Sequence, residues 1–169
     1  GEKFVMVTAY DATFARLVSE AGAECILVGD SLGMVLQGHD TTVPVSLEAM
    51  VYHTECVARA RPHSLIVSDL PFMTYSSPDV ALTASMELMQ KGAQMVKLEG
   101  GTWLSETIHQ LVQRGIPVCA HRGLTPQSGT VFGGYRVMGR TPKEAKSILA
   151  DAVEIQDAGA SIVLLECGP

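Results

Sequence analysis

The sequence predicts an α/β protein whose strands are parallel, buried on both faces and connected by helices. Six short apolar runs recur along the chain, and longer segments of helix-like composition separate them. The runs are almost continuously hydrophobic, which is typical of parallel strands covered on both sides. Hydrophobic residues make up 47% of the 169 residues, so we expect one domain with a large core. The six runs are residues 4–10, 25–30, 64–70, 95–100, 117–122 and 161–168.

Two of the connecting helices have well-marked ends. Ser77 and Pro78 predict an N-cap followed by a proline in the first helical turn, and Gly92 predicts the end of that helix. The segment 141–144, Thr-Pro-Lys-Glu, combines a first-turn proline with the spacing of a capping box. The helix that begins there is expected to run to Gly159.

This alternation of strands and helices is compatible with an open doubly wound sheet or with a (β/α)8 TIM barrel. A nucleotide-binding doubly wound sheet usually has a glycine-rich turn after its first strand, but TAYDATF (8–14) follows here and no GxGxxG occurs. We therefore expect a barrel, with residues 1–169 as a single domain that supplies about the first six βα units. Because six units cannot close such a barrel, the domain is expected to be incomplete at its C-terminus or to be completed by partner segments.

Composition excludes several classes of partner. The formal net charge is −6, and no basic cluster exceeds the Arg59 and Arg61 pair, so nucleic acid is not expected to bind. No apolar run approaches the roughly 20 residues that span a bilayer, and the first residues lack a signal-peptide pattern. We expect a cytoplasmic protein without membrane contact. The four cysteines form no CxxC pair and are expected to be reduced thiols.

Acidic residues repeatedly end the apolar runs. Asp30, Asp69, Glu99 and Glu166 stand in these positions, and the carboxyl ends of parallel strands meet on one face of the fold. Carboxylates buried together need a shared cation, and their oxygens suit a hard ion such as Mg²⁺. Lys97 lies on the same side of its strand as Glu99 and is suited to bind an anionic substrate. The alternative is that each acid only caps the helix that follows it.

The segment 123–140 is the longest irregular stretch of the chain. Its length, and the Gly133-Gly134 pair within it, predict a working loop that forms a wall or lid beside the site. An ordinary surface excursion is the alternative interpretation.

Six motifs resemble the ketopantoate (3-methyl-2-oxobutanoate) hydroxymethyltransferase family, and together they extend over essentially the whole chain in order. They are TAYD (8–11), VGDSLGMVLQGHDTTVPV (28–45), DLPFM (69–73), KGAQMVKLEGG (91–101), GLTPQS (123–128) and FGGYRVMGR (132–140). Relative to the family, a helical lead-in and the last two βα units are absent. Arg122, after His121, departs from the family pattern, in which a small or apolar residue is expected, and it changes the charge expected around His121.

The resemblance implies a magnesium-dependent enzyme of pantothenate biosynthesis. It would transfer a one-carbon unit from the co-substrate 5,10-methylenetetrahydrofolate to 3-methyl-2-oxobutanoate, giving 2-dehydropantoate. Asp30 and Asp69 would hold one Mg²⁺ per subunit, and Glu99 would be a further ligand, directly or through water. The 2-oxo acid would chelate this ion at Asp30 and Asp69. The family is also expected to assemble as a homo-oligomer, decameric in bacteria.

The remaining roles also come from the resemblance. Ser31 and Lys97 would bind the 2-oxo acid, His121 would lie near its oxygens, and Glu166 would be the catalytic base. A base of this kind is expected to have a pKa raised by its surroundings.

Two other functions compete with this interpretation. One is a magnesium-dependent lyase or mutase of the phosphoenolpyruvate mutase and isocitrate lyase type, which would typically supply a catalytic cysteine in a KKCG-like loop, and GLTPQS (123–128) is not such a loop. The other is an inactive fragment that only assembles.

Overall fold

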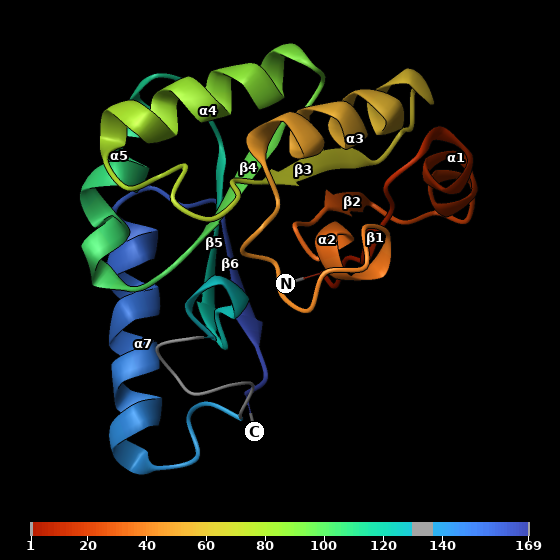
Figure 1. Cartoon of the computed structure of the whole chain (residues 1–169). Coiled ribbons are helices and arrows are strands. Elements are labelled where there is room, and N and C mark those ends of the chain that lie inside the picture. The colour runs from red at the N-terminus through yellow and green to blue at the C-terminus, as the bar shows by residue number, and fades with distance from the viewer. Residues whose placement is uncertain (1, 130–136, 169) are drawn as a thin grey trace.

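The computed structural model describes residues 2–129 and 137–168. Its six strands form one parallel sheet in the order β1-β2-β3-β4-β5-β6, so each strand pairs with its neighbours in sequence. Figure 1 shows this sheet as a curved wall with helices packed along its outer side. A doubly wound sheet reverses its strand order, whereas this one does not. The strand order is therefore that of a TIM-barrel wall, and the sheet forms an open part of such a barrel.

All six predicted strands are present. They are β1 (Met6–Thr8), β2 (Cys25–Val28), β3 (Leu65–Asp69), β4 (Met95–Glu99), β5 (Val118–Gly123) and β6 (Ile162–Glu166). The α-helices of the described residues are α1 (Ala12–Glu20), α2 (Leu32–Val35), α3 (Leu47–Arg59), α4 (Pro78–Gln90), α5 (Ser105–Gln113) and α7 (Pro142–Asp157), and the 3₁₀ turns are η1 (Thr102–Leu104) and η2 (Pro126–Ser128). The expected strand at 4–10 is shortened to three residues, which pair with β2.

The two predicted helix starts are confirmed. At α4, the Ser77 side chain accepts a hydrogen bond from the backbone N–H of Val80, and Pro78 occupies the first turn. At α7, Thr141 and Glu144 form a reciprocal capping box. Both helices are followed by a glycine in the left-handed region, Gly92 with φ +112° and Gly159 with φ +111°. A residue with a Cβ is strained in that conformation, which explains why glycine stands there.

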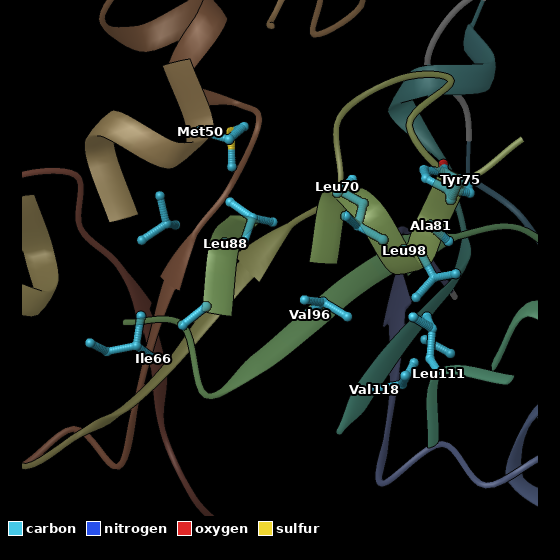
Figure 2. Close-up of a cluster of buried hydrophobic side chains, with 14 of the residues drawn as sticks. Met50, Ile66, Leu70, Tyr75, Ala81, Leu88, Val96, Leu98, Leu111 and Val118 are labelled. Atoms are coloured by element: carbon cyan, nitrogen blue, oxygen red, sulfur yellow. The ribbon is translucent and has the colours of Figure 1, made fainter. Parts of the chain in front are cut away.

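Alternate residues of each strand face two different environments. On β4, Val96 and Leu98 pack under the outer helices, whereas Met95, Lys97 and Glu99 face the concave side. Figure 2 shows the outer core, in which Val96 and Leu98 lie among side chains from the neighbouring strands and helices. On the concave side, Val67, Met95 and Cys119 form a small apolar layer. Polar side chains therefore begin only beyond this layer, toward the carboxyl ends of the strands.

The wall is open between β1 and β6, and large apolar side chains are exposed along both edges. On the β6 side, Leu149 of α7 is 65% exposed. The other exposed apolar residues at the two edges are Phe4, Val5, Val7, Phe14, Leu17, Val153 and Leu165. The described residues thus contain six of the eight strands that a TIM barrel needs.

The cysteines are free, in agreement with the sequence. Cys25 and Cys119 are buried, Cys56 is partly buried and Cys167 is exposed. Burial raises the pKa of the Cys119 thiol to about 12, which keeps it protonated. No helix of the described residues combines the length and the apolar character needed to cross a membrane.

Truncation of Leu98 is expected to destabilise the fold strongly. Leu98 is 1% exposed and lies between Lys97 and Glu99 on β4, so Leu98→Ala would leave a cavity and lower the free energy of unfolding by about 2–5 kcal/mol. Leu149→Ala is the matched control, because the same atoms are removed from an exposed position. Denaturant unfolding would measure both variants. Equal losses of stability would contradict this assignment of the core.

Candidate functional site

A cavity of about 360 Å³ lies on the concave side at the carboxyl ends of the strands. All seven residues predicted for the site line it, so the structure brings them together. They are Asp30, Ser31, Asp69, Lys97, Glu99, His121 and Glu166. The cavity is completed by Thr8, Leu27, Gly29, Met34, Thr42, Pro126 and Leu164.

Asp30, Asp69 and Lys97 form the buried centre of the cavity. The Lys97 Nζ donates to Asp69 Oδ1 at 2.7 Å, and the Asp30 backbone N–H donates to Asp69 Oδ2 at 3.0 Å. Burial, reinforced by the Asp69 carboxylate, raises the pKa of Asp30 to about 7. Burial alone would lower the pKa of Lys97, but the surrounding carboxylates outweigh it and raise this pKa. Lys97 is therefore a permanently charged ammonium, although it is only 6% exposed.

Glu99, His121 and Glu166 form a second group in the same cavity. His121 Nδ1 lies 3.1 Å from Glu99 Oε2, and its Nε2 lies 3.3 Å from Glu166 Oε2. The second contact is within ion-pair distance but is not aligned as a hydrogen bond. Burial lowers the pKa of His121, but the two carboxylates outweigh burial and raise it above its ordinary value. The imidazole therefore lies between two carboxyl groups that favour its protonated form.

The expectation that the pKa of Glu166 is raised is wrong, because this pKa is lowered. The sequence suggested that the surroundings of this base would raise its pKa, but the adjacent His121 lowers it and partial burial does not compensate. The Glu166 side chain is 43% exposed, because it stands on the last strand of the open wall. Glu166 is therefore a carboxylate at neutral pH and can accept a proton.

Gly123 permits the close approach of β6 to β5 at this point. It has φ +94°, and a Cβ at this position would lie 2.3 Å from the backbone oxygen of Glu166. A side chain at 123 would be strained and would displace the backbone of Glu166. The glycine of the GLTPQS motif thus contributes to the position of the Glu166 backbone.

The alternative interpretation of the acids as helix caps is not supported. The residue at the N-cap of α2 is Ser31, that of α4 is Ser77 and that of η1 is Gly101. Asp30 and Glu99 instead bind groups that line the cavity or adjoin it.

Several residues of the site were not predicted from the sequence. Gln127 of η2 donates from its amide to Asp30 and from its backbone to Glu99. Tyr10 bonds through its hydroxyl to Ser31 Oγ at 2.9 Å. Tyr10 belongs to the TAYD motif and Gln127 to the GLTPQS motif, but the motifs alone do not show where these side chains point. The buried Thr42 hydroxyl lines the cavity and has no hydrogen-bond partner in the described part of the chain, which leaves it available to a ligand.

The predicted metal ligands are only partly assembled. Asp30 and Asp69 adjoin one another, but the Glu99 oxygens accept hydrogen bonds from Gln127 and His121. Within residues 2–129 and 137–168, no three Asp, Glu, His or Cys side chains are arranged to hold an ion together. The Asp30–Asp69 pair nevertheless has the chemistry of a cation site, because both carboxyl groups are buried and the charge of Asp69 adds to burial in raising the pKa of Asp30.

The predicted working loop is described in part. Pro126 lines the cavity and Gln127 reaches the acids, so the first part of 123–140 contributes to the site. The Gly133-Gly134 pair lies outside the described residues. Arg122 points away from His121, because neighbouring strand residues face opposite sides, and its Nε binds Asp151 Oδ2 of α7 at 2.5 Å. Its charge is therefore held on the outer side of the wall.

Comparison with known proteins finds one family over the whole chain. The family model described as ketopantoate hydroxymethyltransferase matches residues 1–169. The 3-methyl-2-oxobutanoate hydroxymethyltransferase 2 of Pseudomonas entomophila is 57% identical over the full chain, and the 3-methyl-2-oxobutanoate hydroxymethyltransferase of Burkholderia vietnamiensis is 59% identical. The chain spans 64% and 62% of the length of these two relatives.

Similar solved structures show the same fold at low sequence identity. A 2,3-dimethylmalate lyase, described as a member of the PEP mutase/isocitrate lyase superfamily, matches with a TM-score of 0.70 and 19% identity, covering 97% of this chain and 59% of that chain. A phosphonopyruvate hydrolase in complex with oxalate and Mg²⁺ matches with a TM-score of 0.72 and 13% identity, covering 96% and 58%. At these identities the likeness concerns the fold alone.

The pKa of His121 tests the geometry of the second group. We expect NMR titration to give a pKa above 6.5 for this imidazole, and Glu166→Gln to lower it because one of two anions is lost. Since the pKa is raised in the folded state, protonated His121 stabilises the fold fully below about pH 6.5, and this contribution disappears as the pH rises through the folded pKa. Glu106→Gln, an exposed change on α5, is the control. An unchanged His121 titration in Glu166→Gln would refute the pairing.

Proposed function

The chain belongs to the ketopantoate hydroxymethyltransferase family, and we propose that it carries the catalytic centre for transfer of a one-carbon unit to 3-methyl-2-oxobutanoate. The donor would be 5,10-methylenetetrahydrofolate, and the products would be 2-dehydropantoate, a precursor in pantothenate biosynthesis, and tetrahydrofolate. The observation that carries the proposal is the cavity in which a buried ammonium, Lys97, lies among carboxylates at the strand ends.

In this proposal, Asp30 and Asp69 hold a divalent cation, most naturally Mg²⁺. Their oxygens suit a hard ion, and a cation would offset the burial and the Asp69 charge that together raise the pKa of Asp30. When bound, the cation supplies a Lewis acid that stabilises negative charge on a keto oxygen. Glu99 already accepts hydrogen bonds from His121 and Gln127, so it would contact the cation through a water molecule. The similar phosphonopyruvate hydrolase, which was crystallised with oxalate and Mg²⁺, supports the pairing of this ion with a small oxo acid.

Lys97 and Ser31 would bind the 2-oxo acid. The Lys97 ammonium is held in place by Asp69 and remains charged, so it can bind the carboxylate or the developing enolate oxygen. The Ser31 hydroxyl is oriented by Tyr10 on the cavity wall. His121, whose raised pKa favours the protonated form, would add positive potential near the oxygens of the substrate.

Glu166 would remove the proton from C3 of the substrate. Its lowered pKa keeps it ionised, but this makes it a weaker base than was expected from the sequence. The reaction therefore relies on stabilisation of the enolate, which lowers the pKa of the C3 proton toward that of Glu166. C3 of the enolate then forms a bond to the methylene carbon of the donor, whose two C–N bonds are broken in turn. Water supplies the hydroxyl group of 2-dehydropantoate, and the protons that are released return to the nitrogens of tetrahydrofolate.

A lyase or mutase of the PEP mutase/isocitrate lyase type is the second candidate. The TM-scores of 0.69 to 0.74 favour a shared fold, but identities of 13–19% carry no assignment of activity. That group would typically supply a catalytic cysteine in a KKCG-like loop, whereas the GLTPQS segment of this chain contains no cysteine and supplies Gln127 to the acids. The sequence relationship to the hydroxymethyltransferases is far stronger, at 53–59% identity.

Three further features belong to the proposal. Additional βα units would close the barrel between β6 and β1, which the exposed apolar side chains at both edges support. The protein would act in the cytoplasm as a homo-oligomer, decameric if it follows the bacterial pattern that the family resemblance implies. Analytical ultracentrifugation would measure this assembly directly.

Glu166→Gln is expected to abolish exchange of the C3 proton. The amide cannot accept the proton, so deuterium incorporation into 3-methyl-2-oxobutanoate, followed by NMR, should slow by a factor of about 10²–10⁴. Cation-dependent binding of the substrate should remain measurable. Glu106→Gln should exchange at the parent rate, because Glu106 is exposed on α5. Parent-like exchange in Glu166→Gln would show that another group is the base.

Turnover is expected to require both the folate and the cation. Formation of 2-dehydropantoate from 3-methyl-2-oxobutanoate should depend on tetrahydrofolate with formaldehyde, should stop when EDTA removes the cation, and should resume with added Mg²⁺. Asp30→Asn should require more Mg²⁺, because one of the two adjoining carboxylates is lost. Folate-independent cleavage of a C4-dicarboxylate would instead establish the lyase alternative.

A further inference from the structure

Gln127 is the most completely bonded polar side chain at the acidic centre. It belongs to η2, between β5 and α7, and it is 5% exposed. Its Nε2 donates to Asp30 Oδ2 at 2.8 Å and to the Leu70 carbonyl oxygen at 3.0 Å. Its backbone N–H donates to Glu99 Oε1 at 2.6 Å, and its Oε1 accepts from the Tyr75 hydroxyl. One residue therefore contacts groups that follow or end β2, β3 and β4.

The orientation of this amide follows from its partners. A carboxylate oxygen and a backbone carbonyl accept hydrogen bonds only, so the NH₂ group must face Asp30 and Leu70. The Tyr75 hydroxyl supplies a donor, which suits Oε1. Burial and the nearby Glu99 raise the pKa of Tyr75, so the hydroxyl keeps its proton. The amide thus has a single satisfactory orientation, and it restrains the Asp30 carboxylate.

The neutrality of Gln127 distinguishes it from Lys97. Lys97 holds Asp69 through an ion pair at 2.7 Å and so cancels charge at the centre. Gln127 holds Asp30 and Glu99 by donating hydrogen bonds without adding charge, which leaves their attraction for a cation intact. A neutral donor is thus suited to orient a carboxylate that must also bind an ion.

We propose that Gln127 is a positioning residue for the cation-binding carboxylates. Its side-chain amide orients Asp30 and its backbone N–H orients Glu99, so that both are preset before a divalent cation binds. The inference rests on the proposed function, because it concerns the cation site of that reaction. It predicts that loss of the amide weakens cation binding even where the fold remains intact.

Mn²⁺ is a suitable probe because free Mn²⁺ is detected directly by electron paramagnetic resonance. Gln127→Met keeps an unbranched side chain of similar length but removes the donors and the acceptor of the amide. We expect its Kd for Mn²⁺ to rise by about 10–100-fold relative to the parent. Gln113→Met is the matched control, because Gln113 is exposed at the end of α5. Its Kd should equal that of the parent.

Tyr75→Phe provides an independent test that leaves the backbone of Gln127 in place. It removes the hydroxyl donor to Gln127 Oε1 and retains the ring, which stacks on Trp103 with an interplanar angle of 14°. We expect a smaller rise in the Kd for Mn²⁺, roughly two- to tenfold. Thermal unfolding of each variant would be measured on the same samples, and this readout keeps the test valid if Gln127→Met folds poorly.

The outcomes separate the inference from the proposed function. Asp30→Asn is expected to weaken Mn²⁺ binding relative to the parent. If the parent binds no Mn²⁺, or if Asp30→Asn binds it as tightly as the parent, the proposed cation site is wrong. The inference then fails with it. Parent-like Mn²⁺ affinity in both Gln127→Met and Tyr75→Phe, with Asp30→Asn impaired, would overturn the positioning role alone. Weakened Mn²⁺ binding without loss of thermal stability would support it.

Discussion

Burial of like charges is the constraint on which the site depends. Asp30, Asp69 and Glu99 lie in one cavity of low exposure, where carboxylates cannot remain ionised without compensation. The compensation comes from different parts of the chain: the Lys97 ammonium, the His121 imidazole and the donors of Gln127. Because these groups stand on different strands and on η2, the centre exists only when the strands are paired in register.

The two-residue period of the strands allows one sheet to hold both the core and the site. On β4, the residues that face the helices contribute to the apolar core, and those between them bear the ammonium and a carboxylate. The concave apolar layer of Val67, Met95 and Cys119 packs against Leu27 and Leu164, which line the cavity, and the polar groups of the site lie toward the strand ends. Stability and chemistry are thus divided between the two faces of the same strands.

The His121 contacts connect the cation centre with the base. One ring nitrogen faces Glu99 and the other faces Glu166, so the ring contacts the acidic centre on one side and, on the other, lowers the pKa of the base. Glu166 stands on the edge strand of the open wall, and Gly123 allows its backbone to approach β5. The base is therefore positioned by β5 alone among the described strands, whereas Asp69 and Lys97 are enclosed by strands on both sides.

The sequence by itself determined the parallel α/β class, the six strands, the starts of α4 and α7, and the acids and lysine that line the cavity. These features depend on local periodicity and capping chemistry, which are written in short segments. Only the tertiary structure decided that Gln127 reaches Asp30 across 97 residues, that Glu99 is held by His121, and that the pKa of Glu166 is lowered. The reason is physical: hydrogen bonds and pKa shifts depend on which distant groups meet at a few ångströms, and that proximity arises only when the strands assemble.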